Sequence, residues 1–254
     1  MFDDKKIFDF PKPVTYIEQL IKLCSDEQSI IMDFFGGSAT TAHAVMDINA
    51  KEHSHRKFII VQGYEKVSEE SDAFKSGYRN ICEIGKDRIR RAGKEILKNY
   101  VEENVDVGFK VFKASNTNIK WNSLLSNGQL DLTQIEVSPD QLDFMPDSKD
   151  EDIVYELILR QRDVPLSEKM DRLSNIGERI YLYADSYLVC LESKITEEMV
   201  DKLAGLDPVP VKFIFRDSAF GDDIALKDET FRRLKAVIDK NAGDAKVSYT
   251  VEFI

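Results

Sequence analysis

A glycine turn between an apolar run and a helical pattern sets the strongest limit on the fold. Residues 29–32 (Ser-Ile-Ile-Met) predict a short buried strand, and the sequence Asp-Phe-Phe-Gly-Gly-Ser at 33–38 ends it. Helical spacing of apolar residues returns over 40–48, and residues 57–62 predict a second buried strand. A strand, a helix and a strand of this length form a βαβ unit, so the sequence predicts a parallel sheet.

Further elements are predicted on both sides of this unit. Pro13 is suited to the first turn of a helix over residues 14–23, because its missing N–H costs nothing there. Other helices are expected at 78–100, 151–161, 196–206 and 228–238, strands at 108–113, 178–183, 187–191, 211–216 and 246–253, and loops over most of 116–149. The predicted fold class is therefore α/β, with two regions that meet between residues 99 and 108.

Charge is distributed unevenly between these regions. The chain has 254 residues and a net charge of −11, and residues 1–100 are neutral, so the whole excess lies in residues 101–254. Phosphate-binding surfaces need local Lys and Arg, so the second region is a poor candidate for DNA contact. The charged side chains at 86–94 would point in several directions around a helix. This arrangement favours a solvated helix face over a nucleic-acid site.

Cysteine, histidine and hydropathy patterns narrow the class of protein. Cys24, Cys82 and Cys190 lie far apart and predict free thiols in a reducing cytoplasm. The three histidines show no metal-ligand spacing, so we expect no metal site. No apolar run approaches the roughly 18 residues of a membrane span, and the first residues show no signal-peptide pattern. The sequence predicts a soluble cytoplasmic protein without a membrane partner.

The glycine turn carries the chemistry that points to a ligand. Glycines let a backbone approach a ligand closely, and ligands of open α/β sheets bind beyond the carboxyl ends of the strands. Asp33 favours a cationic group, such as the amino group of a methionyl moiety. Phosphate is a rival ligand, but neither the P-loop nor the dinucleotide glycine pattern is present at 36–39. A tight strand–helix connection without a ligand explains the residues equally well.

Two short motifs give a resemblance to a known family. Residues 10–13 (Phe-Pro-Lys-Pro) and 33–45 resemble motifs X and I of the β-class amino-methyltransferases, adenine-specific enzymes whose S-adenosylmethionine (SAM) half follows the catalytic half along the chain. Within this group the chain resembles the modification (Mod) subunits of type III restriction–modification systems. The segments 56–62, 84–92, 108–113 and 215–220, together with Asn118 and Trp121, resemble later parts of those subunits.

The resemblance implies a fold, a function and a set of partners. It implies a partial Rossmann-like SAM-binding sheet over residues 1–105 and a carboxy-terminal α/β domain over 106–254. The implied function is site-specific DNA adenine methylation with SAM as methyl donor and no metal. The implied partners are DNA, a second Mod subunit and the restriction (Res) subunit. The implied cofactor-binding residues are Lys12, Pro13, Asp33, Phe35, Gly36, Gly37, Ser38, Thr40 and Gln62.

Several of these residues also have an ordinary structural interpretation. Lys12 is implied near the SAM carboxylate, and Gln62, with Tyr64 and Glu65 beyond it, near the ribose or adenine. Without the resemblance Lys12 is a surface lysine and Glu65 a loop acid. Packing in the core explains Phe34 better than a ligand contact does, and it explains Phe35 equally well. We interpret His43 as a packed or capping residue and not as a catalytic one.

The sequence departs from the family in two places. Ala39 stands where family members usually have a glycine. The catalytic Asp-Pro-Pro-Tyr motif, which holds the flipped adenine, is absent from this sequence and lies upstream of motif X in the family. We therefore expect Met1 to be an artificial or secondary start, and the isolated chain to be inactive on DNA.

Two alternatives and one structural expectation remain. The acidic second region could be a subunit-interaction module for Mod dimerisation or Res docking. The chain could also be a SAM- or nucleotide-binding protein with no nucleic-acid role. Because the strand at 29–32 would lack its neighbour, we expect it to pair with a second chain, or residues 1–35 to rearrange over it.

Overall fold

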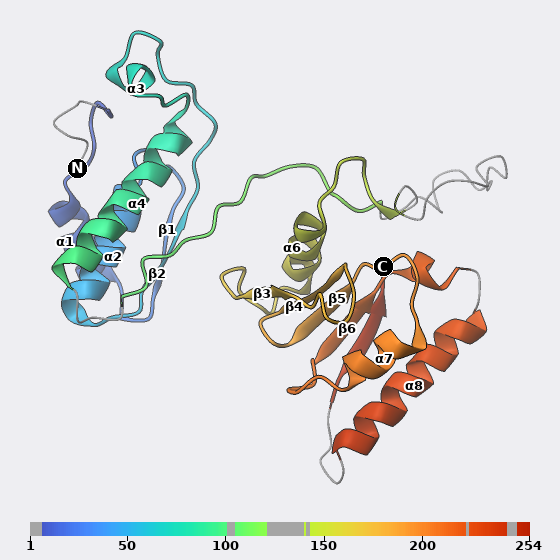
Figure 1. The fold of residues 1–254 in the computed structure, drawn as a ribbon. Coiled ribbons are helices and arrows are strands. Elements are labelled where there is room, and N and C mark those ends of the chain that lie inside the picture. The colour runs from blue at the N-terminus through green and yellow to red at the C-terminus, as the bar shows by residue number, and fades with distance from the viewer. Residues whose placement is uncertain (1–6, 101–104, 121–139, 141–142, 222–223, 243–247) are drawn as a thin grey trace. The chain divides into compact units, whose positions relative to one another are not determined.

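The chain divides into two compact units, each containing helices and strands (Figure 1). The computed structural model describes residues 7–100, 105–120, 140, 143–221, 224–242 and 248–254. Unit 1 is Met1–Lys110 and unit 2 is Val111–Ile254. The fold class is α/β.

Unit 1 is built on a βαβ unit. Its elements are α1 (Val14–Cys24), β1 (Ile30–Asp33), α2 (Thr40–Glu52), β2 (Lys57–Ile60), α3 (Asp72–Lys75) and α4 (Ile81–Asn99). Strands β1 and β2 pair in parallel, so the predicted parallel pairing is confirmed. Pro13 precedes α1 as expected, and Asn80 begins α4 by accepting a hydrogen bond from the Glu83 backbone N–H. The short helix α3 was not predicted.

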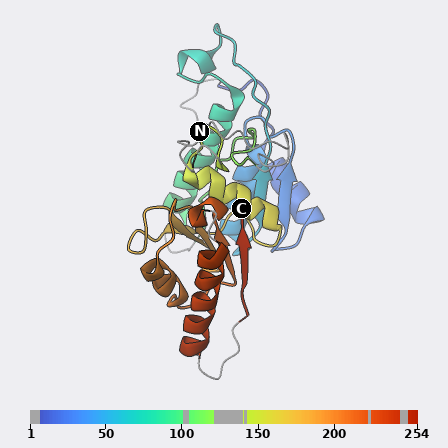
Figure 2. The ribbon, with the colours of Figure 1, turned by 90° about the vertical axis from the view of Figure 1, so that its right-hand side faces the viewer.

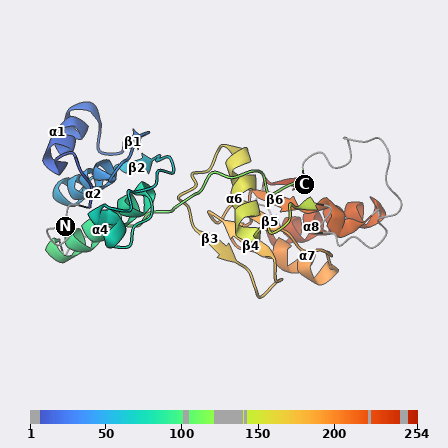
Figure 3. The same ribbon diagram turned by 90° about the horizontal axis from the view of Figure 1, so that it is seen from above.

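The prediction that both strands of unit 1 are buried is wrong. Helices α1, α2 and α4 lie on one side of the strands (Figure 3), where Ile31 and Phe58 pack against them. On the opposite face Ile30 is 61% exposed, Met32 is 49% exposed and Ile59 is also exposed. A continuous apolar run indicates burial on both faces, and the described residues of unit 1 cover only one.

The outer edge of β1 is also uncovered in the described part of the chain. There β1 pairs with β2 alone, in a sheet of two strands. The expected rearrangement over this edge is wrong for residues 7–35, which form α1, β1 and the turns around them, and none of which pairs with the edge. Pairing of this edge with a second chain stays a prediction.

Unit 2 contains a mixed five-stranded sheet. Its elements are α6 (Asp150–Gln161), β3 (Met170–Arg172), β4 (Ile180–Tyr183), β5 (Tyr187–Cys190), α7 (Glu197–Ala204), β6 (Lys212–Phe215), the 3-10 helix η1 (Asp217–Phe220), α8 (Ile224–Ala242) and β7 (Thr250–Phe253). The strand order follows the chain, antiparallel from β3 to β5 and parallel from β5 to β7. The predicted β4–β5 hairpin is confirmed, whereas β3 and η1 were not predicted.

Helices cover both faces of the unit 2 sheet. Helix α6 lies on one side, and α7 and α8 lie on the other (Figure 1), with α8 running beside β7 (Figure 2). Successive strand residues therefore pack in opposite directions: Leu188 and Phe213 against α7 and α8, and Val189 and Ile214 on the α6 side. All four of these side chains are fully buried, as expected for strands covered on both faces.

The strand predicted at 108–113 is wrong, because these residues form no regular element. A strand needs a neighbour to complete its hydrogen bonds, and neither sheet in the described part of the chain pairs with this segment. Its aromatic residues are anchored separately: Phe109 packs in the core of unit 1, and the Phe112 ring lies 5.0 Å from the Tyr155 ring in unit 2. Trp121, most of the expected loop region and the start of the last predicted strand lie outside the described residues.

Candidate functional site

The Gly-Gly turn of unit 1 lies at the carboxyl ends of β1 and β2. The Gly36 N–H donates to the Val61 carbonyl oxygen at 3.1 Å, and the Val61 N–H donates to the Asp33 carbonyl oxygen at 2.8 Å. A Cβ at Gly36 would lie 2.2 Å from Cγ2 of Ile60. Gly36 is therefore required by the close packing of the turn on β2, whether or not a ligand binds.

Gln62 joins the turn through its side chain. Its Oε1 accepts a hydrogen bond from the Gly37 N–H at 2.7 Å, and its Nε2 donates to the Gly63 carbonyl oxygen at 3.1 Å. Gly37 has a φ of +52°, in the left-handed region that favours glycine. The structure thus brings together three of the expected site residues, Gly36, Gly37 and Gln62.

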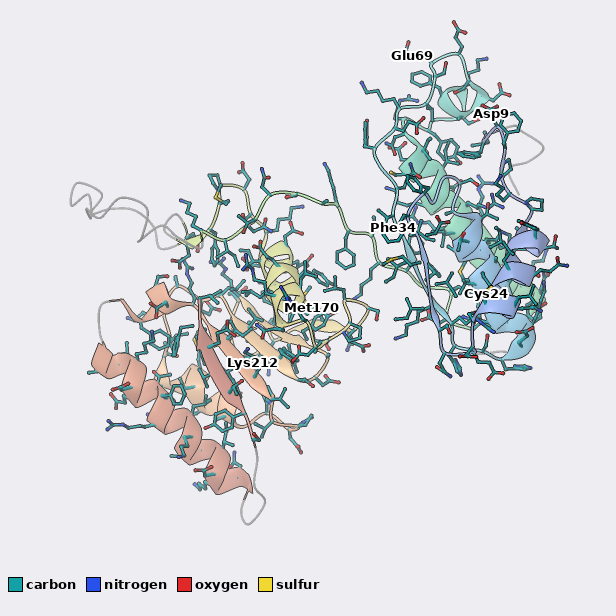
Figure 4. The ribbon with its side chains drawn as sticks, turned by 180° about the vertical axis from the view of Figure 1, so that it is seen from behind. Asp9, Cys24, Phe34, Glu69, Met170 and Lys212 are labelled. Atoms are coloured by element: carbon teal, nitrogen blue, oxygen red, sulfur yellow. The ribbon has the colours of Figure 1, made fainter. Side chains whose placement is uncertain are left out.

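Asp33 braces the turn with both carboxylate oxygens. Its Oδ1 accepts from the Phe35 N–H at 3.0 Å, and its Oδ2 accepts from the Thr41 hydroxyl at 2.6 Å. The Phe35 side chain, expected in a pocket wall, is 91% exposed, and Phe34 at the end of β1 is exposed as well (Figure 4). Packing in the core, the alternative for these two rings, is therefore wrong within the described residues.

Ser38 and Thr40 are buried where the turn enters α2. Their hydroxyl oxygens lie 3.3 Å apart, and Arg88 of α4 donates from Nη1 to the Ser38 hydroxyl at 2.8 Å. Ala39 between them has a φ of 58°, a conformation that costs an alanine about 1 kcal/mol. The structure thus groups Ser38 and Thr40 on the inner side of the turn, away from Phe35.

Arg88 is a residue that the sequence analysis missed. The stretch 86–94 was expected to be a solvated helix face, but the Arg88 side chain is buried with 7% of the residue exposed. The helical spacing could have predicted that Arg88 is buried, because Arg88 lies four residues after Ile84 and four before Ala92, and both of these residues are buried.

Lys12 and Pro13 lie just before α1, and both residues are exposed. Their contact with SAM stays a prediction. Phe8, in the same segment, lies beside the turn, with Cζ 3.3 Å from the place of a Cβ on Gly37. Ile7 and Phe8 pack against α3 and α4, so the segment before α1 is anchored beside the turn.

His43 lies one turn into α2 and is partly buried. Burial lowers the pKa of its imidazole, and the nearby Arg88 guanidinium lowers it further. No described residue accepts from or donates to its Nδ1. Among the described residues no three His, Cys, Asp or Glu side chains lie close enough to hold a metal ion. No helix in the described ranges is long and apolar enough to cross a membrane.

Comparison with known proteins gives matches to unit 1. Residues 3–106 match the family model of DNA methylases. The chain is 40% identical over 113 residues to the StyLTI Mod subunit of a type III restriction–modification enzyme from Salmonella typhimurium, covering 44% of this chain and 17% of that protein. It is also 40% identical over 106 residues to the EcoPI Mod subunit from Escherichia phage P1, covering 42% and 16%.

A type II enzyme matches the same region. The chain is 35% identical over 99 residues to the methyltransferase M.KpnI from Klebsiella pneumoniae, covering 39% of this chain and 22% of that enzyme. The chain thus matches less than a quarter of the length of each of these relatives. The resemblance to Mod subunits is confirmed for this region, which is also the region that matches the DNA methylase family model.

Proposed function

We propose that this chain is the SAM-binding part of an adenine-specific DNA methyltransferase of the type III Mod kind. In this proposal unit 1 carries the SAM turn, and unit 2 is the carboxy-terminal domain of the Mod subunit. The observation that carries the proposal is the braced turn, residues 33–41, at the carboxyl ends of two parallel strands. Ligands of open α/β sheets bind at this place, and the methylase match covers it.

The residues of the turn suit the chemistry of SAM. The methionyl part of SAM carries an ammonium and a carboxylate. The partly exposed Asp33 carboxylate suits the ammonium, and the N-terminus of the 13-residue helix α2 suits an anion. Beside Gly63 there is open space, because an added Cβ would meet nothing within 4 Å. In the proposal Phe35 and Gln62 flank this space, and Lys12 and Pro13 lie by the methionyl end of SAM.

The proposed reaction is a direct methyl transfer. The exocyclic amine of adenine attacks the methyl carbon of SAM, an N–C bond forms as the S–C bond breaks, the amine loses a proton, and S-adenosylhomocysteine leaves. Holding both reactants in line supplies much of the rate. This sequence lacks the Asp-Pro-Pro-Tyr motif that would hold the adenine, so the chain alone would bind SAM without methylating DNA.

The open face of β1 and β2 supports a site for the rest of the methylase. Ile30, Met32, Ile59 and Val61 are exposed there, next to the uncovered edge of β1. Unpaired strand edges and contiguous apolar surface favour association with other polypeptide. In the proposal the catalytic part of the same enzyme covers this face and supplies the contacts with DNA. The second Mod subunit and the Res subunit would assemble on the complete enzyme.

Unit 2 gives less support to the alternative of a docking module. An interface would present a contiguous apolar patch. The exposed large apolar residues in its described part come from several segments: Val111 and Phe112, Met145 before α6, Leu159 of α6, Val211 before β6 and Phe231 of α8. The acidic charge of unit 2 favours neither a Mod nor a Res partner by itself.

Calorimetry with SAM tests the proposed function. We expect the chain to bind SAM weakly, and Asp33→Ala to weaken binding by about tenfold or more, because a hydrogen bond to a charged group contributes about 1.5–3 kcal/mol. Asp26→Ala is the matched control, since Asp26 is exposed before β1 at the opposite end of the strand. Equal affinities of the Asp33→Ala and unaltered chains would remove Asp33 from the site.

A methyl-transfer assay tests the expectation that this chain alone does not methylate DNA. Radiolabelled SAM and adenine-containing duplex DNA should give no incorporation above background with this chain. Incorporation in a preparation free of other methyltransferases would contradict the proposed division between a SAM-binding part and a catalytic part.

A further inference from the structure

Arg88 is a buried cation without a carboxylate partner. Its only hydrogen bond within the described residues is the one from Nη1 to the Ser38 hydroxyl, at 2.8 Å. No Asp or Glu of the described residues forms an ion pair with it, and its buried Nε has no acceptor there. Burial accordingly lowers the pKa of the guanidinium. An unpaired buried charge costs several kcal/mol, so packing of an apolar residue would be more stable at this position.

The partner of Arg88 belongs to the SAM turn. The Ser38 hydroxyl that receives the Arg88 bond also lies 3.3 Å from the Thr40 hydroxyl, at the first residue of α2. Both side chains are buried, and Ser38 lies two residues before the first residue of α2. Arg88 therefore holds the segment that leads into the first turn of α2, whose N–H groups have no acceptor within the helix.

Helix α4 also contacts the turn at Gly85, three residues before Arg88. A Cβ at Gly85 would lie 3.3 Å from the Gly37 carbonyl oxygen and 3.4 Å from Cβ of Ala39. Gly85 and Arg88 are three residues apart and share one face of α4. Helix α4 thus meets Gly37, Ser38 and Ala39 in succession, by close backbone approach at Gly85 and by a charged hydrogen bond at Arg88.

We propose that Arg88 is a positioning residue of the SAM site, which fixes the ligand turn through Ser38 without touching SAM. This proposal rests on the proposed function and adds a residue from a helix outside the motif. Its charge beside the N-terminus of α2 also adds to the positive potential there, which suits the SAM carboxylate. Loss of Arg88 should loosen the turn and lower the affinity for SAM.

The test compares Arg88→Met with Arg90→Met in the full chain. Arg90 lies on the same helix but is exposed, with its guanidinium 5.5 Å from the Phe109 ring. We expect Arg88→Met to speed hydrogen exchange of the amides at 34–41 at least tenfold, and to weaken SAM binding about tenfold in calorimetry. Arg90→Met should change neither quantity. Urea unfolding of each variant separates a local effect on the turn from a general loss of stability.

Two further variants keep the test decisive if Arg88→Met folds poorly. Ser38→Ala removes the acceptor and should have the same effect as Arg88→Met, and the double variant should be no worse than either one, because the two residues act as a unit. Arg88→Lys keeps the charge and one donor and should restore part of the SAM affinity. Additive effects of Ser38 and Arg88, or unchanged exchange at 34–41 in both single variants, would overturn the proposal. Failure of the unaltered chain to bind SAM would instead contradict the proposed function, since the exchange measurement needs no ligand.

Discussion

The two sheets of this protein differ in how they are covered. In unit 2, α6 packs on one face and α7 and α8 on the other, so β5 and β6 are almost fully buried. In unit 1, helices pack on one face of β1 and β2, and the other face exposes apolar side chains in the described residues. Among the described residues, similar apolar strands are thus covered on both faces in unit 2 and on one face in unit 1.

The two units also differ in the hydrogen-bond partners of their buried arginines. Arg216 of unit 2 is 0% exposed and donates to the Asp140 and Asp143 carboxylates, with Nη1 2.6 Å from Asp140 Oδ1. The ring of Phe144 lies 4.8 Å from its guanidinium. Arg88 of unit 1 has a hydroxyl as its hydrogen-bond partner. The first arrangement stabilises a fold, whereas the second leaves a cation beside the proposed ligand turn.

The largest effect is expected from removing the Arg216 cation. Arg216→Met should destabilise unit 2 by about 3–5 kcal/mol, because it removes two hydrogen bonds between charged groups and leaves Asp143 without this cation, whereas Asp140 keeps its pair with Arg179. Arg172→Met is the matched control, since the Arg172–Glu178 pair is exposed and its loss should change stability by less than about 0.5 kcal/mol. Urea unfolding followed by pulse proteolysis, with fragments assigned to each unit by mass, measures both. Similar losses in the two variants would show that the burial of Arg216 does not matter.

A smaller effect is expected from truncating a strand residue in each sheet. Leu188→Ala in β5 should destabilise unit 2 by about 3 kcal/mol, because Leu188 is fully buried. Met32→Ala in β1 should change the stability of unit 1 by less than about 0.5 kcal/mol, because Met32 lies on the open face. The same unfolding measurement applies. A cost for Met32→Ala close to that of Leu188→Ala would mean that something covers the open face in solution, as a dimer would.

The smallest of these effects concerns pH. Burial lowers the pKa of His43 below its ordinary value of 6.5, so the unfolded chain binds more protons than the folded one below that pH. Unit 1 should therefore be stable at neutral pH and lose stability as the pH falls from 6.5 towards the folded pKa. The groups around His43 are Arg88, Asp47, Glu95 and Lys51. Unit 2 contains no histidine, so it should lack this dependence.

Substitution of His43 checks the assignment. His43→Gln should remove the loss of unit 1 stability between pH 7.5 and 5.5, whereas His55→Gln, at an exposed position, should retain it. Equal pH dependence in both variants would assign the effect to other groups.

Local sequence patterns predicted most elements because their causes are local. The Thr196 cap and the turn at Ala184 and Asp185 each act within a few residues, so α7 and the β4–β5 hairpin were predicted. The errors required knowledge of neighbours. The segment 108–113 alternates like a strand but has no partner, and β1 is apolar but lacks a cover.

The candidate site was predicted in part for the same reason. Gly36, Gly37 and Ser38 are consecutive, so the strand–turn–helix pattern located them. Arg88 and Phe8 reach the turn from distant positions in the sequence, and only tertiary packing brings them there. The involvement of Gln62 was expected from the resemblance, but its bond to the Gly37 N–H was not.

The central claim is that SAM binds to the turn of unit 1, and hydrogen exchange with and without SAM tests it most directly. The amides at 33–41 and 60–63 should exchange more slowly when SAM is present, while those of β4, β5 and β6 in unit 2 should not change. Slower exchange confined to unit 2, or no change at 33–41 at SAM concentrations that saturate binding, would contradict the account.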